Sequence, residues 1–328
     1  MGSAPLESRH GGEENEITAP LELQSLREGW AKLEARAPEW HAEVTFAAKT
    51  DLGRVRENNE DKFDFLEPEE PAVLAARGRF YAVCDGMGGH AAGQIASELA
   101  LKSIIKKYYA NTTDDLETAL AAAVQYANAL ILDTAATIPG RSGMGTTFTG
   151  AILHEEYLIA AQVGDSRLYL IRDGEIRQIT QDHSWVAEQI RLGVLDPESA
   201  ARSPFRNVIT RSLGAQESVE VDLFREKIRP GDVILLCSDG LTGHLDDQEI
   251  ALLARRSAPS VACMELIDAA NDRGGRDNIT VLIIRVDAVK RFDPAAEPAD
   301  PGEEPAPEAP PSPPTEGEKR RRFPLPWR

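Results

Sequence analysis

The stretch TTFTGAILHEEYLIAAQVGDSRLYLIRDGEIRQIT, residues 146–180, contains four short runs rich in β-branched and aromatic residues. Connectors as short as HEE (154–156) and RDG (172–174) separate runs within it. Parallel strands need crossovers of a dozen or more residues, whereas connectors this short can only close hairpins. The stretch therefore predicts an antiparallel sheet.

Residues 91–136 follow a different period. Their apolar residues recur at helical spacing in two groups, Ile95, Leu99, Leu101, Ile104, Ile105 and Tyr108, then Leu116, Leu120, Val124 and Ile131. Asp114 and Glu117 have the spacing of a capping box, which predicts where the second helix begins. Helices in blocks beside antiparallel strands indicate the α+β class.

The two ends of the chain differ from its middle. Residues 1–42 are acidic and carry one short helical stripe, which either rests on the main domain or binds a partner. Residues 293–318 are mostly Pro, Ala and acidic residues, so we expect a disordered linker. Residues 319–328, KRRRFPLPWR, form either a solvated basic end or a docking tail for an acidic partner or a membrane surface. The domain itself is predicted over residues 43–292.

Charge and cysteine content narrow the class of protein. The net charge of −18 disfavours nucleic acid as a partner, since binding to duplexes relies on clustered Lys and Arg. No apolar run approaches the roughly 20 residues that span a bilayer, so we expect no transmembrane segment. Cys84, Cys237 and Cys263 are odd in number and lack metal-type spacing, which favours a reducing compartment and a cytoplasmic protein.

Carboxylates recur where apolar runs meet loops. In YAVCDGMGGH, residues 81–90, the apolar run ends on Asp85, and taken alone this is an ordinary Asp-Gly turn pair. The arrangement returns at Asp239 in DVILLCSDGLTG, at Asp277 in GGRDNITVLIIRV and at Asp165 in VGDSRLYL. Turns alone do not require four carboxylates at the ends of apolar strands.

If these strand ends converge, several negative charges share a small volume, which is unfavourable unless a cation lies between them. The candidate ligands are oxygens, with no paired His or Cys, so the pattern indicates Mg²⁺ or Mn²⁺ over Zn²⁺. Gly86 has no side chain to keep its own carbonyl out of the coordination shell.

Seven segments, from about Val44 to Val286, resemble in order the bacterial type of the metal-dependent protein serine/threonine phosphatases (type 2C). They are TDLGRVRENNEDKF, VCDGMGGHAAGQIAS, SGMGTTFTGAIL, VGDSRLYLIRDGEIRQITQDHSWV, RNVITRSLG, LLCSDGLTG and DNITVLII. The resemblance implies a four-layer sandwich in which two antiparallel β-sheets pack face to face between helices. It also implies a centre of two Mn²⁺ or Mg²⁺ ions, with a third in some bacterial relatives.

The resemblance also implies the ligands. Asp85 would bridge both metals, Asp239 and Asp277 would hold the first, and the Gly86 carbonyl with Glu60 the second. Asp165, together with Asp239, would hold the third metal. Asp61 would orient bound water.

The implied reaction is direct attack of metal-activated water on phosphoserine or phosphothreonine, which reverses the signals of serine/threonine kinases. Phosphorylated proteins and their kinases are therefore the expected partners. Arg56 would bind the phosphoryl oxygens and His90 would be the general acid; taken alone, they would be a surface salt bridge and a helix cap. His183 is assigned a structural role, and residues 185–207 correspond to the family's mobile flap.

Two alternative functions can be tested against the same sequence. A thiolate phosphatase needs an arginine six residues after its cysteine, and His90, Gly243 and Ala269 stand there instead. A catalytically silent relative that only binds phosphoproteins would lack a metal aspartate, and none is missing.

Overall fold

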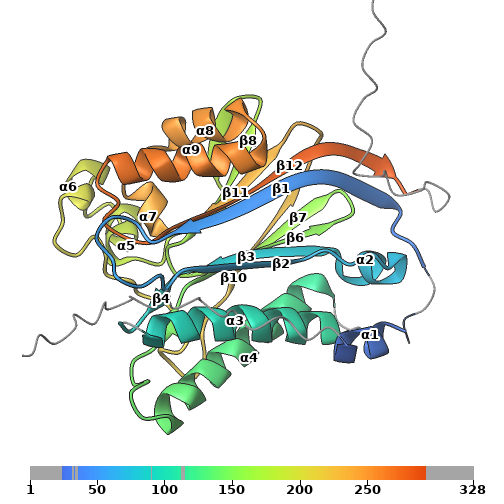
Figure 1. Ribbon diagram of the computed structural model, residues 1–328, viewed down its shortest axis with the longest axis horizontal. Helices are drawn as coiled ribbons and strands as arrows, with labels where there is room; N and C mark the ends of the chain where they lie inside the picture. Colours follow the sequence, from blue (N-terminus) through green and yellow to red (C-terminus); the bar gives the residue numbers. More distant parts are fainter. Residues whose placement is uncertain (1–23, 32, 34–35, 90, 112–114, 293–328) are drawn as a thin grey trace, which may run out of the picture. The chain divides into compact units, whose positions relative to one another are not determined.

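The structure is a computed structural model that describes residues 24–31, 33, 36–89, 91–111 and 115–292. Its centre is formed by two five-stranded sheets that lie one above the other (Figure 1). One sheet has the order β1 (Trp40–Asp51), β12 (Ile279–Arg291), β11 (Val233–Cys237), β8 (Arg167–Arg172) and β9 (Glu175–Gln178). The other has the order β10 (Asp222–Lys227), β7 (Tyr157–Val163), β6 (Phe148–His154), β3 (Arg79–Cys84) and β2 (Lys62–Leu66).

Helices cover the outer face of each sheet, so the predicted four-layer α+β sandwich is confirmed. Helices α3 (Ala91–Ala110) and α4 (Leu116–Thr137) cover the β2–β10 sheet, and α8 (Asp247–Arg256) and α9 (Pro259–Asp272) cover the other (Figure 1). The core between the sheets is made of alternating inward-facing residues, among them Tyr81, Leu236 and Leu282, which are fully buried. The remaining helices are short: α1 (Gln24–Trp30), α2 (Pro71–Arg77), α5 (Trp185–Arg191), α6 (Pro197–Ala201) and α7 (Asp239–Thr242).

The hairpins predicted from the short connectors are present as β6–β7 and β8–β9, and every strand pairing within the described residues is antiparallel. The connection from β7 to β8 is different, because these strands belong to different sheets. Residues 164–166 therefore cross from one sheet to the other, which leaves Asp165 at the end of the sandwich.

Strand register gathers the predicted carboxylates at one end of the sandwich. In one sheet Asp51 pairs with Ile279, and Cys237 pairs with both Val281 and Arg167, so these strand ends are level. In the other sheet the level strand ends are Lys62 with Cys84 and Phe148 with Val163. The loops that leave these ends carry Glu60, Asp61, Asp85, Asp165, Asp239 and Asp277. A small third sheet, β4 (Gly86–Met87) with β5 (Gly145–Thr146), borders the same end.

Helix α4 differs from its prediction in two respects. Its N-cap is Asp115, whose carboxylate accepts hydrogen bonds from the Thr118 N–H and hydroxyl at 2.9 and 2.7 Å, and not Asp114 with Glu117. By length and composition alone α4 could also cross a membrane, with a mean hydropathy of 1.2 over its most apolar window. Its buried residues, such as Leu120, Val124 and Ile131, pack into the core under the sheet, which is typical of a core helix.

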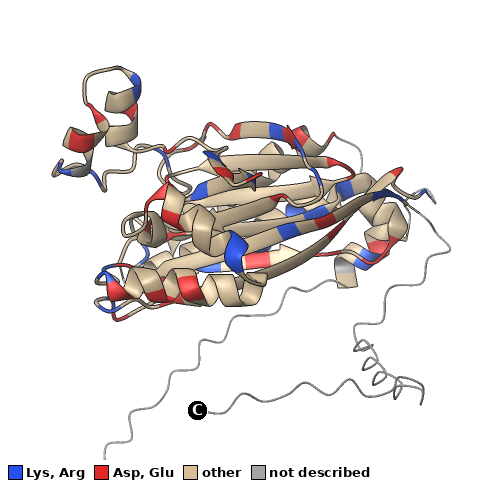
Figure 2. Ribbon diagram, turned by 90° about the horizontal axis from the view of Figure 1, so that it is seen from above, with Lys and Arg blue, Asp and Glu red and all other residues tan. Residues whose placement is uncertain are grey.

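Helix α1 rests on the domain, which is the first of the two alternatives for the N-terminal stripe. Leu26 and Trp30 are buried, and the Trp30 indole N–H donates to the Tyr109 carbonyl at 3.3 Å. The predicted linker and tail, residues 293–318 and 319–328, lie outside the described residues, as does most of the N-terminal extension. Across the described residues, Lys and Arg are interspersed with Asp and Glu (Figure 2).

Candidate metal centre and active site

Asp85 is held in place through its backbone. The Asp85 N–H donates to the Thr147 hydroxyl at 2.8 Å, and the Asp85 carbonyl accepts from the Thr147 N–H at 2.8 Å and the Thr146 hydroxyl at 2.9 Å. The Thr147 hydroxyl also contacts that of Ser166 at 2.8 Å, beside Asp165. This buried network joins the loops that carry two of the carboxylates.

Asp239 and Asp277 come from loops that approach each other closely. A Cβ on Gly240 would lie 1.9 Å from the Asn278 carbonyl oxygen, so only glycine fits beside Asp239. The Asp239 carboxyl is buried close to the carboxyls of Asp85 and Asp277. Asp277 is paired with Arg56 at 2.6 Å.

Asp61 ties the start of β2 to the Asp239 loop. Its Oδ2 accepts from the Ser238 hydroxyl at 2.6 Å, and that hydroxyl accepts the Thr280 N–H at 3.0 Å. The Asp61 carboxylate is therefore held by a protein hydroxyl, which agrees with a role in orienting water and not in binding a metal directly.

Glu60 lies against the first turn of α3. Its carbonyl accepts from the Gly86 N–H at 3.2 Å and from the Ser97 hydroxyl at 2.7 Å. A Cβ on Gly93 would lie 2.0 Å from Glu60 Oε2, and a Cβ on Gly86 would lie 2.2 Å from the Gly93 carbonyl oxygen. Gly86 is thus required by the close approach of its neighbours, a stronger reason than freedom of its own carbonyl.

Asn278 was missed by the sequence analysis. Its Nδ2 donates to the carbonyls of Leu52 and Asn58, both at 3.0 Å, while its Oδ1 accepts the Glu60 N–H at 2.9 Å. One buried amide thereby clamps the loop that carries Arg56 and Glu60. The sequence signal that could have identified Asn278 is its position, directly after Asp277 and directly before an apolar strand.

Asp165 lies in the turn between the sheets and is itself buried. Its Oδ1 accepts no hydrogen bond from any of the residues that the structure describes. Arg167, two residues on, donates from Nε and Nη2 to Asp182 at 2.7–3.0 Å and fixes the turn. An orphaned, buried carboxylate oxygen is a natural position for a cation ligand.

His183 supports the same turn and has a structural role, as predicted. Its Nδ1 accepts the Gly164 N–H at 3.0 Å, and its Nε2 lies 3.1 Å from Asp222 Oδ2 and 3.0 Å from Arg211 Nη1. Burial lowers the pKa of His183, which keeps Nδ1 free to accept.

Burial and mutual repulsion raise the pKa of the clustered carboxyls. The pKa of Asp85 is raised well above its ordinary value, first by burial and then by Asp61, Asp239, Asp165 and Asp277. The pKa of Asp61 rises to about 7 and that of Asp165 to about 8, with burial as the main cause of each. Burial and Asp277 raise the pKa of Asp239 as well. Four raised pKa values mark a site that lacks positive charge.

The residues at this end of the sandwich fit a hard divalent cation by donor chemistry and by charge. All the candidate side-chain donors are carboxylates, and the orphaned oxygen of Asp165 is among them. No group of three or more His, Cys, Asp or Glu within the described ranges forms a ready-made ligand sphere. Arg56 pairs with one of these carboxylates, Asp277.

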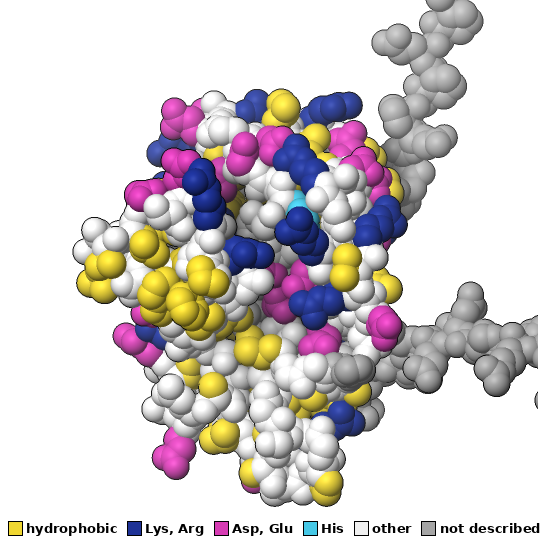
Figure 3. Space-filling model, turned by 90° about the vertical axis from the view of Figure 1, so that its left-hand side faces the viewer, with side chains coloured by type: hydrophobic (Ala, Val, Ile, Leu, Met, Phe, Trp, Pro, Cys, Tyr) yellow, Lys and Arg dark blue, Asp and Glu magenta, His cyan; other side chains and the backbone are white. Residues whose placement is uncertain are grey.

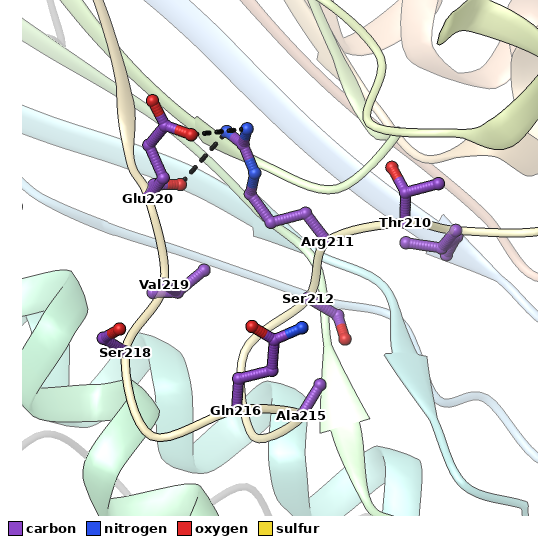
Figure 4. A pocket seen from close by; sticks show the side chains of 9 residues that line it. Thr210, Arg211, Ser212, Ala215, Gln216, Ser218, Val219 and Glu220 are labelled. Atoms are coloured by element: carbon purple, nitrogen blue, oxygen red, sulfur yellow. Dashed lines mark hydrogen bonds and ion pairs between the residues drawn. The ribbon is translucent and has the colours of Figure 1, made fainter. Parts of the chain in front are cut away.

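Figure 3 shows this end of the molecule, where acidic side chains lie at the floor of a hollow bordered by Lys and Arg side chains. A pocket of about 230 Å³ at Asp239 and Asp277 is completed by Arg206, Asn207, Gly240, Gly243, His244, Arg273 and Arg276. Figure 4 shows a second pocket, of about 250 Å³, at the loop of residues 209–220, where Arg211 is paired with Glu220 at 2.9 Å.

Comparison with known proteins identifies the architecture. A profile of protein phosphatase 2C matches residues 48–215. The serine/threonine phosphatase stp of Listeria monocytogenes is 37% identical over 258 residues, which are 76% of this chain and 98% of that protein. This chain belongs to the protein phosphatase 2C family. Two solved structures agree with the assignment to protein phosphatase 2C.

The first is the PstP phosphatase of Mycobacterium tuberculosis, with a TM-score of 0.66, 36% identity, and coverage of 74% of this chain and 98% of that one. The second is a PstP catalytic domain in complex with two manganese ions, with a TM-score of 0.64 and 35% identity. It covers 74% of this chain and 97% of its own. Protein phosphatase 2C enzymes depend on Mn²⁺ or Mg²⁺, in agreement with the carboxylate-rich centre found here.

Gly93→Ala provides a steric test of the centre. Alanine favours a helix over glycine by about 1 kcal/mol, so helix propensity alone predicts a stabilised protein. We expect instead a loss of Mn²⁺ affinity and activity of at least about tenfold, because the new Cβ displaces the Glu60 carboxylate. Mn²⁺ binding by calorimetry and turnover of an aryl phosphate measure the effect. Gly29→Ala is the matched control, since this glycine of α1 has no atom within 4 Å of the added Cβ. Equal behaviour of the two variants would contradict the assignment.

Proposed function

We infer that this protein is a metal-dependent phosphoprotein phosphatase that hydrolyses phosphoserine and phosphothreonine in proteins with the help of Mn²⁺ or Mg²⁺. Membership of the protein phosphatase 2C family supports the reaction. The buried carboxylates that gather at one end of the sandwich support the assignment of this reaction to them. The reading as a catalytically silent relative finds no support, because Asp85, Asp239 and Asp277 are all present.

Asp85, Asp239 and Asp277, with Glu60 and the Gly86 carbonyl, would hold two ions, and Asp165 with Asp239 would hold a third. When bound, such ions lower the pKa of water toward neutrality and neutralise charge that develops on the phosphoryl oxygens. Thr146 and Thr147 set the position of Asp85 through its backbone, and Asn278 sets that of Glu60. Asp61, anchored on Ser238, would orient bound water.

Arg56 would bind the phosphoryl group of the substrate. Its guanidinium is half exposed and pairs with Asp277, so it lies at the edge of the centre with its charge directed inward. Because a guanidinium matches phosphate bidentately, a phosphoryl group can replace the carboxylate as its partner once Asp277 ligates a cation. His90, the predicted general acid, lies outside the described residues, and its role stays a prediction.

The cellular setting is proposed on the same basis. The substrates require protein kinases that phosphorylate serine and threonine, and the enzyme would reverse their signals. All three cysteines are buried and unpaired, which supports a reducing compartment such as the cytoplasm.

The reaction is tested with synthetic phosphoserine and phosphothreonine peptides and the full-length protein. We expect phosphate release in Mn²⁺ or Mg²⁺ and none in EDTA, with activity restored when excess Mn²⁺ is added back. Full activity in EDTA would refute a metal-dependent mechanism.

The C-terminal segment offers a separate prediction about recruitment. Its last ten residues are basic and aromatic, unlike the acidic remainder of the chain, and would dock an acidic partner. Deletion of residues 293–328 should leave kcat/KM for an aryl phosphate unchanged while slowing dephosphorylation of a physiological phosphoprotein by about tenfold. An equal loss on both substrates would argue against recruitment.

A further inference from the structure

The pocket of about 230 Å³ beside the carboxylates has two walls of opposite charge. Asp239 and Asp277 form the first wall, while Arg206, Arg273 and Arg276 with His244 line the remainder. Neither Arg56 nor Glu60 lines this pocket. The pocket therefore adjoins the proposed metal centre at Asp239 and Asp277, and its remaining charged residues have no place in the proposed reaction.

Two of these arginines, Arg206 and Arg276, have side chains that are not paired with an acidic residue among those that the structure describes. The exposed side chains of Arg206 and Arg276 form no hydrogen bond or ion pair with any other residue in the described part of the chain. By contrast, Arg56 pairs with Asp277 and Arg211 with Glu220. Both guanidinium groups therefore remain available to bind an anion at this pocket.

The loop that carries Arg276 is fixed by its neighbours. Arg273 Nη1 donates to the His244 carbonyl at 2.8 Å and to Glu249 at 2.7 Å, which joins the loop to α8. Gly274 and Gly275 have φ values of +120° and +46°, and a Cβ on Gly275 would lie 2.3 Å from Asn271 Oδ1. The loop thus holds the Arg276 backbone in place while its guanidinium reaches into solvent.

His244 adds a third donor to the pocket. Its Nε2 accepts the Arg276 backbone N–H at 3.1 Å, so in the neutral ring the proton is on Nδ1. Burial, Arg276 and Arg273 lower the pKa of His244, which keeps the ring neutral. The pocket therefore offers two guanidinium groups and an imidazole N–H, all of them donors suited to an oxyanion.

We propose that this pocket is a second anion subsite, formed by Arg206, His244 and Arg276, that binds a further anionic group of the phosphoprotein substrate near the phosphoryl group to be removed. The inference rests on the proposed function. The ligand is a carboxylate or a second phosphoryl group, since each has at least two anionic oxygens that can accept a pair of hydrogen bonds from one guanidinium. The subsite selects substrates with acidic or doubly phosphorylated sequences.

The test uses phosphothreonine peptides of equal length that differ only in their flanking residues. One has alanine on both sides, a series carries a single glutamate at successive flanking positions, and a matching series carries a second phosphothreonine. We expect kcat/KM for the best acidic peptide to exceed that of the alanine peptide by about tenfold, mostly through KM. The glutamate and phosphothreonine series separate the two ligands, and the preference should decline as NaCl screens the charges.

Arg276→Gln should remove this preference and leave kcat/KM for an aryl phosphate and for the alanine peptide unchanged. Arg276→Lys, which keeps the charge without the fork, should retain part of it. Arg229→Gln is the matched control, because Arg229 is an exposed arginine four residues before Val233, at the opposite end of β11 from Asp239.

The outcomes are distinguishable. If Arg276→Gln slows the aryl phosphate and every peptide equally, Arg276 serves the metal centre and the subsite is refuted. If the wild-type enzyme shows no preference for acidic peptides, or Arg276→Gln keeps that preference, the subsite is refuted too. Failure of the wild-type protein to hydrolyse the alanine peptide in Mn²⁺ would instead contradict the proposed function.

Discussion

Asp239→Asn is expected to lower kcat for an aryl phosphate by about 10³-fold in saturating Mn²⁺, with little change in folding. One electrostatic contact to a transition state is commonly worth about 10²–10³-fold, and a metal ligand affects both water activation and charge neutralisation. Asp239 adjoins Asp85 and Asp277, and it would be a ligand of the metal centre. Steady-state kinetics together with Mn²⁺ titration by calorimetry measure the loss.

The matched control is Asp115→Asn, the same substitution at the N-cap of α4, where asparagine caps as well as aspartate. It should keep wild-type activity. Retention of more than about a tenth of the activity by Asp239→Asn would contradict its assignment as a ligand, given the magnitude expected above.

Asp85→Asn is expected to stabilise the metal-free protein at pH 8 by about 1–3 kcal/mol, since each unit of raised folded-state pKa opposes folding by about 1.4 kcal/mol once the group is ionised. The Asp85 carboxyl is buried among other carboxyls, and its pKa is raised well above the ordinary value. The asparagine amide has nearly the same size but carries no charge. The free energy of unfolding in EDTA, measured by urea titration, tests the prediction.

The sign of the pH dependence follows from the same shift. A carboxyl whose pKa is higher in the folded state binds more protons there, so its contribution to stability falls as pH rises from about 4 toward the folded-state pKa. For Asp61 and Asp165, whose pKa values rise to about 7 and about 8, this window ends near pH 7 and pH 8 respectively. The difference between Asp85→Asn and wild type should therefore disappear near pH 4.

Mn²⁺ should reverse the order of the two proteins. A ligand at 100 times its Kd stabilises the folded state by about 2.7 kcal/mol, and the wild type should receive this gain while Asp85→Asn receives much less. If Asp85→Asn is less stable than the wild type in EDTA at pH 8, the carboxylates do not oppose folding, and the electrostatic argument for a cation centre fails.

The loss of activity in Asp239→Asn and the gain of stability in Asp85→Asn have the same cause, the concentration of negative charge in the centre. The clustered carboxylates repel one another in the metal-free protein and so oppose folding. The same carboxylates bind a cation strongly, because Mn²⁺ or Mg²⁺ removes that repulsion. Loss of stability is therefore expected to accompany catalytic power in this centre.

The amino-acid sequence by itself was sufficient for the fold class and for the identity of the clustered carboxylates. Short connectors exclude parallel pairing, and an aspartate at the end of an apolar strand is visible as a local pattern. The order of the seven motifs then showed a resemblance to one protein family, which implies that Asp85, Asp165, Asp239 and Asp277 are metal ligands. Such features depend on neighbours within a few residues, and for that reason they can be read from the chain.

The tertiary structure alone decided which loops meet. The β7–β8 connection changes sheets, Asn278 clamps a loop some 220 residues away in sequence, and Arg276 shares a pocket with Arg206 of another loop. It also showed that Gly86 and Gly93 are required by each other and by Glu60. Contacts between distant segments depend on strand register and on how the two sheets stack, and no local pattern of residue types encodes either.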